Sequence, residues 1–366
     1  MNENDIYVIY GSNGKETVKN LLKTIKIENE LNKDMLIGLK PNLVVAKVPE
    51  SGATTSTDMI CGIIEYLKDF GFNNVVILES SWVGESTKKA FKVCGYDKIS
   101  KKYNVSLFDN KEDSFHIYNV DDFSVSICDK PMSLNYLINL PVLKGHCQTR
   151  ITCALKNMKG CIPDKEKRRF HSLGLHKPIA YLNKILRPSL HIVDGLIGDL
   201  DFEEGGNPVE MNRIIAGKDP VLIDSYAAEL MGYNPYDIEY IKIAESIGVG
   251  SADLQKANII ELNSDDIAQT HFTNPGRKVQ YLSKWVIENN SCSACYGSLI
   301  HALGRLDEQG LLKYLEKRIY IGQGFKEKEI DGVGIGMCTR NFTHSVNGCP
   351  PKAKDILNFL MQQLKR

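Results

Sequence analysis

The chain has 366 residues, of which 43% are hydrophobic and 25% are charged. These proportions are those of a folded protein with a sizeable core, and the length suggests more than one domain. Its 45 basic residues are balanced by 45 acidic ones, which argues against a nucleic-acid partner because a phosphate backbone requires a basic face. No stretch approaches the roughly 20 apolar residues of a membrane helix, and the start, MNENDIYVIY, lacks the features of a secretory signal. We therefore expect a cytoplasmic protein with no membrane partner.

Short apolar runs alternate with amphipathic stretches, which is the pattern of strands crossed by helices on a parallel sheet. The predicted strands are Ile6–Tyr10, Met35–Leu39, Val75–Leu78, Val105–Phe108, Tyr136–Leu140, Leu190–Val193 and Ile259–Leu262. The predicted helices are Thr17–Ile27, Thr57–Phe70, Thr87–Cys94, Ile179–Ile185, Ser225–Met231, Ile238–Ile247 and Ala353–Leu364. The segment Phe115–Cys128 predicts a hairpin instead, because two alternating runs flank Asp121 and Asp122. The fold class is thus α/β, with a mixed, mainly parallel sheet flanked by helices.

The pattern changes after about residue 264, where helical stretches and glycine-rich loops replace the alternation. This change predicts an α/β domain over residues 1–264 and a smaller C-terminal domain over residues 265–366. The run Gly11–Lys15 resembles a phosphate-binding loop only superficially, and we expect a turn that opens the first helix.

Four of the ten cysteines lie near the C-terminus in an unusual pattern. Cys292 and Cys295 form a two-residue-spaced pair, Cys338 follows a glycine-rich run, and Cys349 lies in the sequence GCPP. In a reducing compartment such a set indicates a metal site, and four thiolates are the number that a 4Fe–4S cluster needs. Nearby glycines allow backbone N–H groups to approach the sulfides of a cluster. We therefore predict one iron–sulfur cluster in a C-terminal domain, and a cluster that is sensitive to oxygen.

Two alternatives to a cluster stay open. Four cysteines also satisfy a structural zinc site, although zinc ribbons usually bring two CxxC pairs and this chain has one pair and two single cysteines. The other alternative is that no metal binds. The remaining six cysteines are isolated, and we expect them to be small buried side chains: Cys61, Cys94, Cys128, Cys147, Cys153 and Cys161.

Polar clusters follow several predicted strands of the large domain. They are Lys40-Pro41-Asn42, Glu79-Ser80-Ser81, Lys144-Gly145-His146 and Asp194-Gly195. Ligands of open α/β sheets bind beyond the carboxyl ends of strands, so we expect these clusters to face one cleft. Glu79 and Asp194 are also candidate ligands for a divalent metal.

The segment after the strand Tyr136–Leu140 is rich in groups that bind anions. A buried strand leading to Lys144 and His146, followed by a helix start, predicts a cradle for phosphate or carboxylate. The basic run at residues 165–169 is interpreted as a solvated loop, and the histidines nearby as hydrogen-bonded structural residues rather than a mononuclear metal site. No GxSxG elbow supports a serine nucleophile, and Cys147 beside His146 lacks an evident orienting partner.

Several of these segments resemble the family named domain of unknown function 362 (DUF362). They are LKPNLV, Thr54-Thr55, ILES, INLPVLKGH, ALKNMKGC, IVDGLIG and IIAGKDPVLIDSYAAELMG, within about residues 35 to 255. The resemblance implies a redox context, because proteins of this family are often coupled to four-iron ferredoxin-like segments. The usual run CxxCxxCxxxCP is absent, and the GCPP ending resembles cluster sites of other electron-transfer proteins. The resemblance implies a family site made of Lys40, Asn42, Glu79, Lys144, His146, Lys156, Asn157, His171, Asp194 and Asp224.

These observations favour an iron–sulfur reductase that acts on a small anionic substrate. In this hypothesis Lys144 and Lys156 hold the anion, and His146 or His171 supplies a proton. An external electron donor or acceptor is required, because the sequence has no flavin or nicotinamide motif. The alternatives are a non-catalytic electron carrier or cluster-based sensor, and a zinc-stabilised binding module. The sequence leaves oligomer formation open.

Overall fold

The α/β domain is built on an eight-stranded mixed sheet. A computed structural model describes residues 1–263 and 277–364. The strand order is β12-β1-β11-β10-β7-β2-β3-β4, and β11 is antiparallel to both of its neighbours while all the other neighbours are parallel. The strands are β1 (Asp5–Tyr10), β2 (Ile37–Pro41), β3 (Val75–Glu79), β4 (Ser106–Asp109), β7 (Tyr136–Leu140), β10 (Leu190–Asp199), β11 (Pro208–Gly217) and β12 (Asn258–Glu261). The predicted fold class is confirmed.

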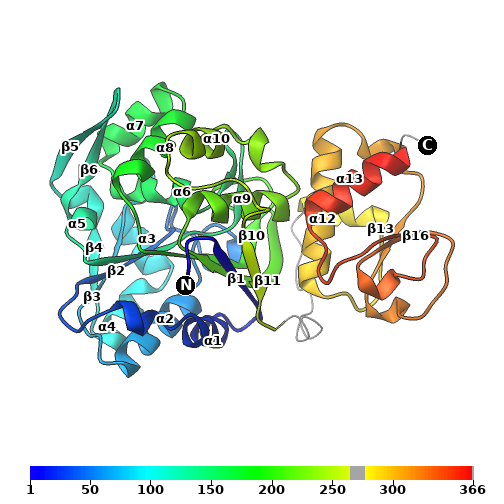
Figure 1. Ribbon diagram of the computed structural model, residues 1–366, viewed down its shortest axis with the longest axis horizontal. Helices are drawn as coiled ribbons and strands as arrows, with labels where there is room; N and C mark the ends of the chain where they lie inside the picture. The colour runs from blue at the N-terminus through cyan, green and yellow to red at the C-terminus, as the bar shows by residue number, and fades with distance from the viewer. Residues whose placement is uncertain (264–276, 365–366) are drawn as a thin grey trace.

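Helices cover both faces of this sheet, as Figure 1 shows. One face packs against α1 (Gly14–Ile25), α2 (Thr57–Asp69), α3 (Thr87–Val93) and α4 (Tyr96–Tyr103). The other face packs against α6 (Ala154–Asn157), α7 (Asp164–Ser172), α8 (His176–Ile185), α9 (Pro220–Leu230) and α10 (Glu239–Ser246). The predicted hairpin is confirmed as β5 (Phe115–Val120) and β6 (Phe123–Cys128), which are followed by α5 (Asp129–Met132). Each layer therefore has its own hydrophobic core.

Local sequence signals explain where two of these helices begin. The side chain of Asn13 accepts a hydrogen bond from the backbone N–H of Glu16, so the glycine-rich run before α1 is a helix-capping turn. Asp219 caps α9 by accepting from the backbone N–H groups of Val221 and Leu222, and Pro220 occupies the first helical position. Both helices start with standard capping chemistry.

The C-terminal unit contains a second sheet that the sequence did not predict. Its four parallel strands have the order β13-β14-β15-β16. The elements are α11 (Arg277–Leu282), β13 (Val286–Glu288), α12 (Ser293–Glu308), β14 (Ile319–Ile321), β15 (Val333–Ile335), β16 (His344–Val346) and α13 (Ala353–Leu364). The predicted boundary after residue 264 lies outside the described residues. None of the helices in residues 1–263 and 277–364 is both long and apolar enough to cross a membrane.

Helix α12 joins the two parts of the molecule. It lies beside β11, at the side of the α/β domain that faces the C-terminal unit (Figure 1). Its apolar side chains Leu299 and Leu303 belong to the same core as Val209 and Met211 of β11. The contact is close at Gly297, where an added Cβ would lie 2.8 Å from the backbone oxygen of Glu210. The C-terminal unit therefore shares a hydrophobic core with the α/β domain.

This close approach predicts different effects for the same substitution at two glycines of α12. Gly297→Ala should lower the free energy of unfolding by about 1–3 kcal/mol, because the new methyl group meets backbone that cannot move aside. Gly304→Ala should leave it unchanged or raise it by up to about 1 kcal/mol, since alanine favours the helix. There the new methyl group meets only a flexible end of Leu200, at 3.3 Å. Urea unfolding followed by circular dichroism measures both values, and equal changes would contradict the close docking of α12.

Candidate functional site

A cavity of about 540 Å³ opens at the carboxyl ends of β2 and β3. We call it the polar cavity. It is lined by the turns after β2 and β3, the segment after β7, helices α6 and α7 with the residues between them, and the loop after β10. Six predicted site residues are among its lining: Asn42, Glu79, His146, Lys156, Asn157 and His171. The strand-end clusters of β2, β3 and the segment after β7 thus meet in one place, as parallel strands require.

The other four predicted residues do not line the polar cavity. Lys40 and Lys144 are fully buried just behind its wall, where they contact Glu79 and Asn42. Asp194 and Asp224 lie outside the cavity lining, and their carboxylates accept hydrogen bonds from backbone N–H groups. The lining residues that were not predicted site residues include Glu203 and Lys159.

Lys40 and Glu79 form a buried ion pair at the base of the cavity. The Nζ atom of Lys40 donates to the Glu79 carboxylate at 2.8 Å, and both side chains are at most 3% exposed. The same carboxylate accepts from the backbone N–H groups of Leu43 at 3.2 Å and Ser80 at 2.7 Å. The pair therefore fixes the chain directly after β2 and β3, because a buried charge must have all its partners in place.

A chain of hydrogen-bonded amides continues this network across the sheet. Asn42 donates to the side-chain oxygen of Asn157 at 2.9 Å, and Asn157 donates to that of Asn139 at 2.7 Å. Asn139 donates in turn to the backbone oxygen of Ala154 at 2.9 Å. Each amide orients the next, so the rotamers of the cavity wall are fixed before any ligand binds.

Lys144 contacts only neutral oxygen atoms. Its Nζ atom donates to the side chain of Asn42 at 2.9 Å and to the backbone oxygen atoms of Ala53 at 2.5 Å and Glu203 at 2.7 Å. Burial lowers the pKa of this lysine to about 7. Lys144 thus connects three segments of the cavity wall, and it does not reach the cavity itself.

His146 is held in one orientation and one tautomer. Its Nδ1 atom accepts hydrogen bonds from the backbone N–H groups of Gln148 at 3.1 Å and Thr149 at 3.0 Å. The proton of the neutral ring is therefore on Nε2, which lies 3.2 Å from the Glu203 carboxylate. Burial lowers the pKa of His146 below its usual value, which favours this neutral form.

Glu203 is the centre of charge in the cavity. One carboxylate oxygen contacts Nζ of Lys156 at 2.5 Å and the other contacts His146. Burial alone would raise the pKa of Glu203, but Lys156 and His146 outweigh it and hold the pKa well below its usual range. The sequence signal for Glu203 is an acidic run between β10 and two glycines, and it reads equally well as a solvated turn.

Lys159 and His171 also line the cavity, as do the charged residues Lys167, Arg168 and Glu204. The Nζ atom of Lys159 lies 3.5 Å from Nε2 of His171, which is exposed at the end of α7. Burial, and then repulsion from Lys156, lower the pKa of Lys159 to about 7. Burial and the neighbouring Lys159 lower the pKa of His171 as well. The cavity therefore gains or loses positive charge close to neutral pH.

The predicted solvated loop over residues 165–169 is wrong. These residues form part of α7, and Lys167 is only 5% exposed. Its Nζ atom donates to the hydroxyl of Ser80 at 2.6 Å and to the backbone oxygen of Ser81 at 2.7 Å. The strand end after β3 accepts this ammonium group, a long-range contact that charge pattern alone does not show.

Asp194 and Asp224 hold backbone in place. Asp194 accepts from the N–H groups of Ser56 at 2.7 Å and Leu196 at 3.0 Å, and burial raises its pKa to about 6. Asp224 accepts from the N–H groups of Ala154 and Leu155 at the start of α6, and burial raises its pKa to about 7. Asp224 thus positions the helix that carries Lys156 and Asn157.

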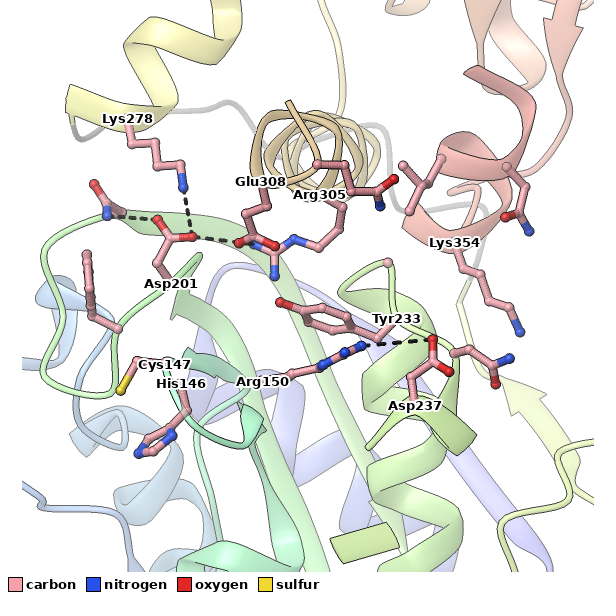
Figure 2. A pocket seen from close by; sticks show the side chains of 17 residues that line it. His146, Cys147, Arg150, Asp201, Tyr233, Asp237, Lys278, Arg305, Glu308 and Lys354 are labelled. Atoms are coloured by element: carbon pink, nitrogen blue, oxygen red, sulfur yellow. Dashed lines mark hydrogen bonds and ion pairs between the residues drawn. The ribbon is translucent and has the colours of Figure 1, made fainter. Parts of the chain in front are cut away.

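A second cavity, of about 850 Å³, lies between the α/β domain and the C-terminal unit. Figure 2 shows its charged lining, with Tyr233 between the guanidinium groups of Arg150 and Arg305. Asp201 pairs with Lys278 at 3.0 Å and with Arg305 at 3.4 Å. We call this the inter-unit cavity. His146 lines both cavities and so lies at their junction.

The four C-terminal cysteines gather at the carboxyl edge of the second sheet. Cys292 precedes α12 after β13, Cys338 follows β15, and Cys349 follows β16. The neighbouring thiols of Cys292 and Cys349, and then burial, raise the pKa of Cys295 well above its usual value, so these three side chains lie close together. Burial raises the pKa of Cys338, and the nearby thiols of Cys292 and Cys349 raise it further. The parallel arrangement of the strands brings together residues that are more than 50 positions apart in sequence.

The chemistry around these thiols suits a cluster. Gln323 donates to the sulfur of Cys292 at 3.7 Å, and an added Cβ at Gly336 would lie 3.9 Å from the sulfur of Cys295. The start of α12 carries a partial positive charge that favours thiolates. Within residues 1–263 and 277–364, however, no group of three or more His, Cys, Asp or Glu side chains is arranged to hold a metal ion. The iron–sulfur site therefore stays a prediction.

The chain is similar to a curated protein and to a solved structure over part of its length. The chain is 22% identical to the thylakoid-associated protein sll1697 of Synechocystis sp. over 223 residues, which cover 58% of this chain and 67% of that protein. Among solved structures it is similar to the lactate racemase apoprotein from Thermoanaerobacterium thermosaccharolyticum, with a TM-score of 0.40 and 11% identity. That match covers 66% of this chain and 56% of the racemase chain.

The family model described as "Domain of unknown function (DUF362)" matches residues 37–229, which is more than half of the chain. This range contains the strand ends, the amide chain and the lysines that build the polar cavity. The chain belongs to the DUF362 family.

Proposed function

We propose that this protein is an iron–sulfur redox enzyme of the reductase type that acts on a small anionic substrate. One cluster, of the 4Fe–4S type, would be held by Cys292, Cys295, Cys338 and Cys349, and the substrate would bind in the polar cavity. An external donor or acceptor would exchange electrons with the cluster, in the reducing cytoplasm. The observation that carries the proposal is the meeting of the cysteine thiols at one edge of the C-terminal sheet.

The donor set favours iron–sulfur chemistry. All ten cysteines are free thiols. Four thiolates, with glycine backbone and one amide donor beside them, match the ligands and the hydrogen bonding that such clusters use. A bound cluster supplies or accepts electrons one at a time.

The polar cavity provides the charge and the proton that an anionic substrate needs. Lys156 and Lys159 supply positive charge inside it. His171 is exposed to solvent and is placed to exchange a proton. His146 can present only its Nε2 proton, because two backbone N–H groups occupy Nδ1. These groups orient an anion and deliver a proton, which is what reduction of an organic substrate requires.

Helix α12 connects the cysteines to the loop that carries Glu203. Its first turn carries Cys295, and Arg305, near its other end, contacts Asp201 in the inter-unit cavity. Ten residues of helix span about 15 Å at 1.5 Å per residue. A change in the polar cavity should therefore leave the cysteines undisturbed.

Cluster assembly gives the first test of the proposal. Cys349→Ser should remove most of the bound iron, since a four-thiolate site has no spare ligand. Cys161→Ser should retain it, because Cys161 is buried in the core of the α/β domain. Iron, sulfide and zinc analysis after anaerobic purification, with absorption spectroscopy, measures the outcome. A colourless protein that contains zinc would overturn the redox proposal.

Anion binding gives an independent test. Lys156→Met should weaken the binding of acetate or inorganic phosphate at least about tenfold, the loss expected for one charge-assisted hydrogen bond. Trp82 lines the polar cavity and reports binding by fluorescence once Trp285, the other tryptophan, is replaced by Phe. Lys88→Met, which alters an exposed lysine, is the control. Iron content should be equal in all variants, and a parallel loss of iron in Lys156→Met would place this lysine beside the cluster.

The pH dependence of binding should follow Lys159. Because the pKa of Lys159 is lowered to about 7, its positive charge is present below that pH and is lost above it. Acetate affinity should therefore be greatest below pH 7 and fall by up to about tenfold per pH unit above it, as linkage to one proton requires. Titrations between pH 6.5 and 9 measure this slope. Lys159→Gln should flatten it, and an unchanged slope in that variant would show that another group titrates.

A further inference from the structure

The carboxylate of Glu203 lies where the positive groups of the polar cavity converge. Its two oxygen atoms have separate partners: Lys156 binds one at 2.5 Å and Nε2 of His146 lies 3.2 Å from the other. Lys159 is close enough to act on the same charge. A side chain of the protein thus fills the position with the strongest attraction for an anion.

The backbone around Glu203 is fixed. The carboxylate of Asp199 accepts from the N–H groups of Asp201 at 2.9 Å, Phe202 at 2.6 Å and Asn207 at 2.6 Å. Lys144 holds the backbone oxygen of Glu203 at 2.7 Å. Only the side chain of Glu203, which is 25% exposed, is therefore free to leave without disturbing the loop.

We propose that the ligand of the polar cavity is a small carboxylate, and that it binds by displacing the carboxylate of Glu203 from Lys156 and His146. This inference rests on the anion site proposed above. The position of Glu203 shows that Lys156 and His146 can bind one planar carboxylate, each of them through a different oxygen atom. Binding is then an exchange of one carboxylate for another, and Glu203 sets the affinity by competing with the ligand.

The rest of the cavity limits the body of this ligand. Val44, Trp82 and Val83 line it on the side of the strand ends after β2 and β3, so an apolar portion can pack there. The volume of about 540 Å³ lies within the range of small-molecule sites. A short-chain carboxylate with an apolar or weakly polar body fits both features.

Removal of the competing charge tests the proposal. In the Trp285→Phe background, Glu203→Gln should bind acetate at least about tenfold more tightly than the parent, measured by the fluorescence of Trp82. Glu204→Gln is the matched control, because it removes the same charge from the next residue of the loop, which also lines the cavity but has an exposed side chain, whereas Lys156 and His146 pair with Glu203. Its affinity should stay within about twofold of the parent, as expected for an exposed charge that is screened by salt.

A second variant guards against misfolding. Glu203→Asp keeps the charge but shortens the side chain by one methylene, so the carboxylate no longer spans both donors, and acetate should again bind more tightly. Unchanged or weaker acetate binding by the folded Glu203 variants, with binding to the parent intact, would overturn this inference alone. An equal gain in Glu204→Gln would also overturn it, since a general charge effect would then explain the result. If the parent and all the variants bind neither acetate nor inorganic phosphate, the proposed anion site itself fails.

Discussion

The structure depends on the burial of lysine ammonium groups at the carboxyl ends of its parallel strands. Lys40, Lys144, Lys156 and Lys167 are each at most 5% exposed. A buried charge is costly unless hydrogen bonds and counter-charges compensate it. Each of these lysines therefore determines the position of the segments that supply its oxygen acceptors. The loops at this edge of the sheet are held together by that requirement.

The four lysines differ in the groups that compensate their positive charge, and these differences indicate their roles. Lys40 has a carboxylate partner, and Lys167 has oxygen atoms of the strand end after β3 and the carboxylate of Asp164, so both stabilise the fold. Lys144 has only neutral acceptors and joins three segments. Lys156 and Lys167 both line the cavity and pair with partly exposed carboxylates, Glu203 and Asp164. Of the two, Lys156 is the lysine whose carboxylate partner is shared with a second cavity donor, His146. Lys156 is thus the lysine suited to bind a ligand, because a ligand can replace its counter-charge, Glu203.

Much of the fold and part of the site could be predicted from sequence, for physical reasons. Strands such as Tyr136–Leu140 are mainly apolar runs because both faces are buried, and site residues such as Asn42 and Glu79 lie at the carboxyl ends of strands. The antiparallel β11 was missed because its polar positions interrupt the apolar pattern. The C-terminal strands were missed because each has only three residues.

The role of Glu203 could not be predicted because it depends on pairing across the fold. It comes from a loop 47 residues after Lys156 in sequence, and only the tertiary structure brings the two together. The same holds for Lys167 and Ser80, which are 87 residues apart. Sequence pattern identifies which side chains lie beyond a strand, but not which loop from another strand will neutralise them.

The loop that carries Glu203 also ties the polar cavity to the C-terminal unit. Asp201, two residues earlier, pairs with Lys278 of α11 and Arg305 of α12, and the backbone oxygen of Leu200 accepts from Arg305 at 3.3 Å. Cys292 and Cys295 lie at the other end of α12. Because these contacts fix the loop backbone from one side and Lys144 fixes it from the other, Glu203 can be exchanged for a ligand without separating the two units. The arrangement thus keeps binding local to the cavity while the C-terminal unit stays docked on β11.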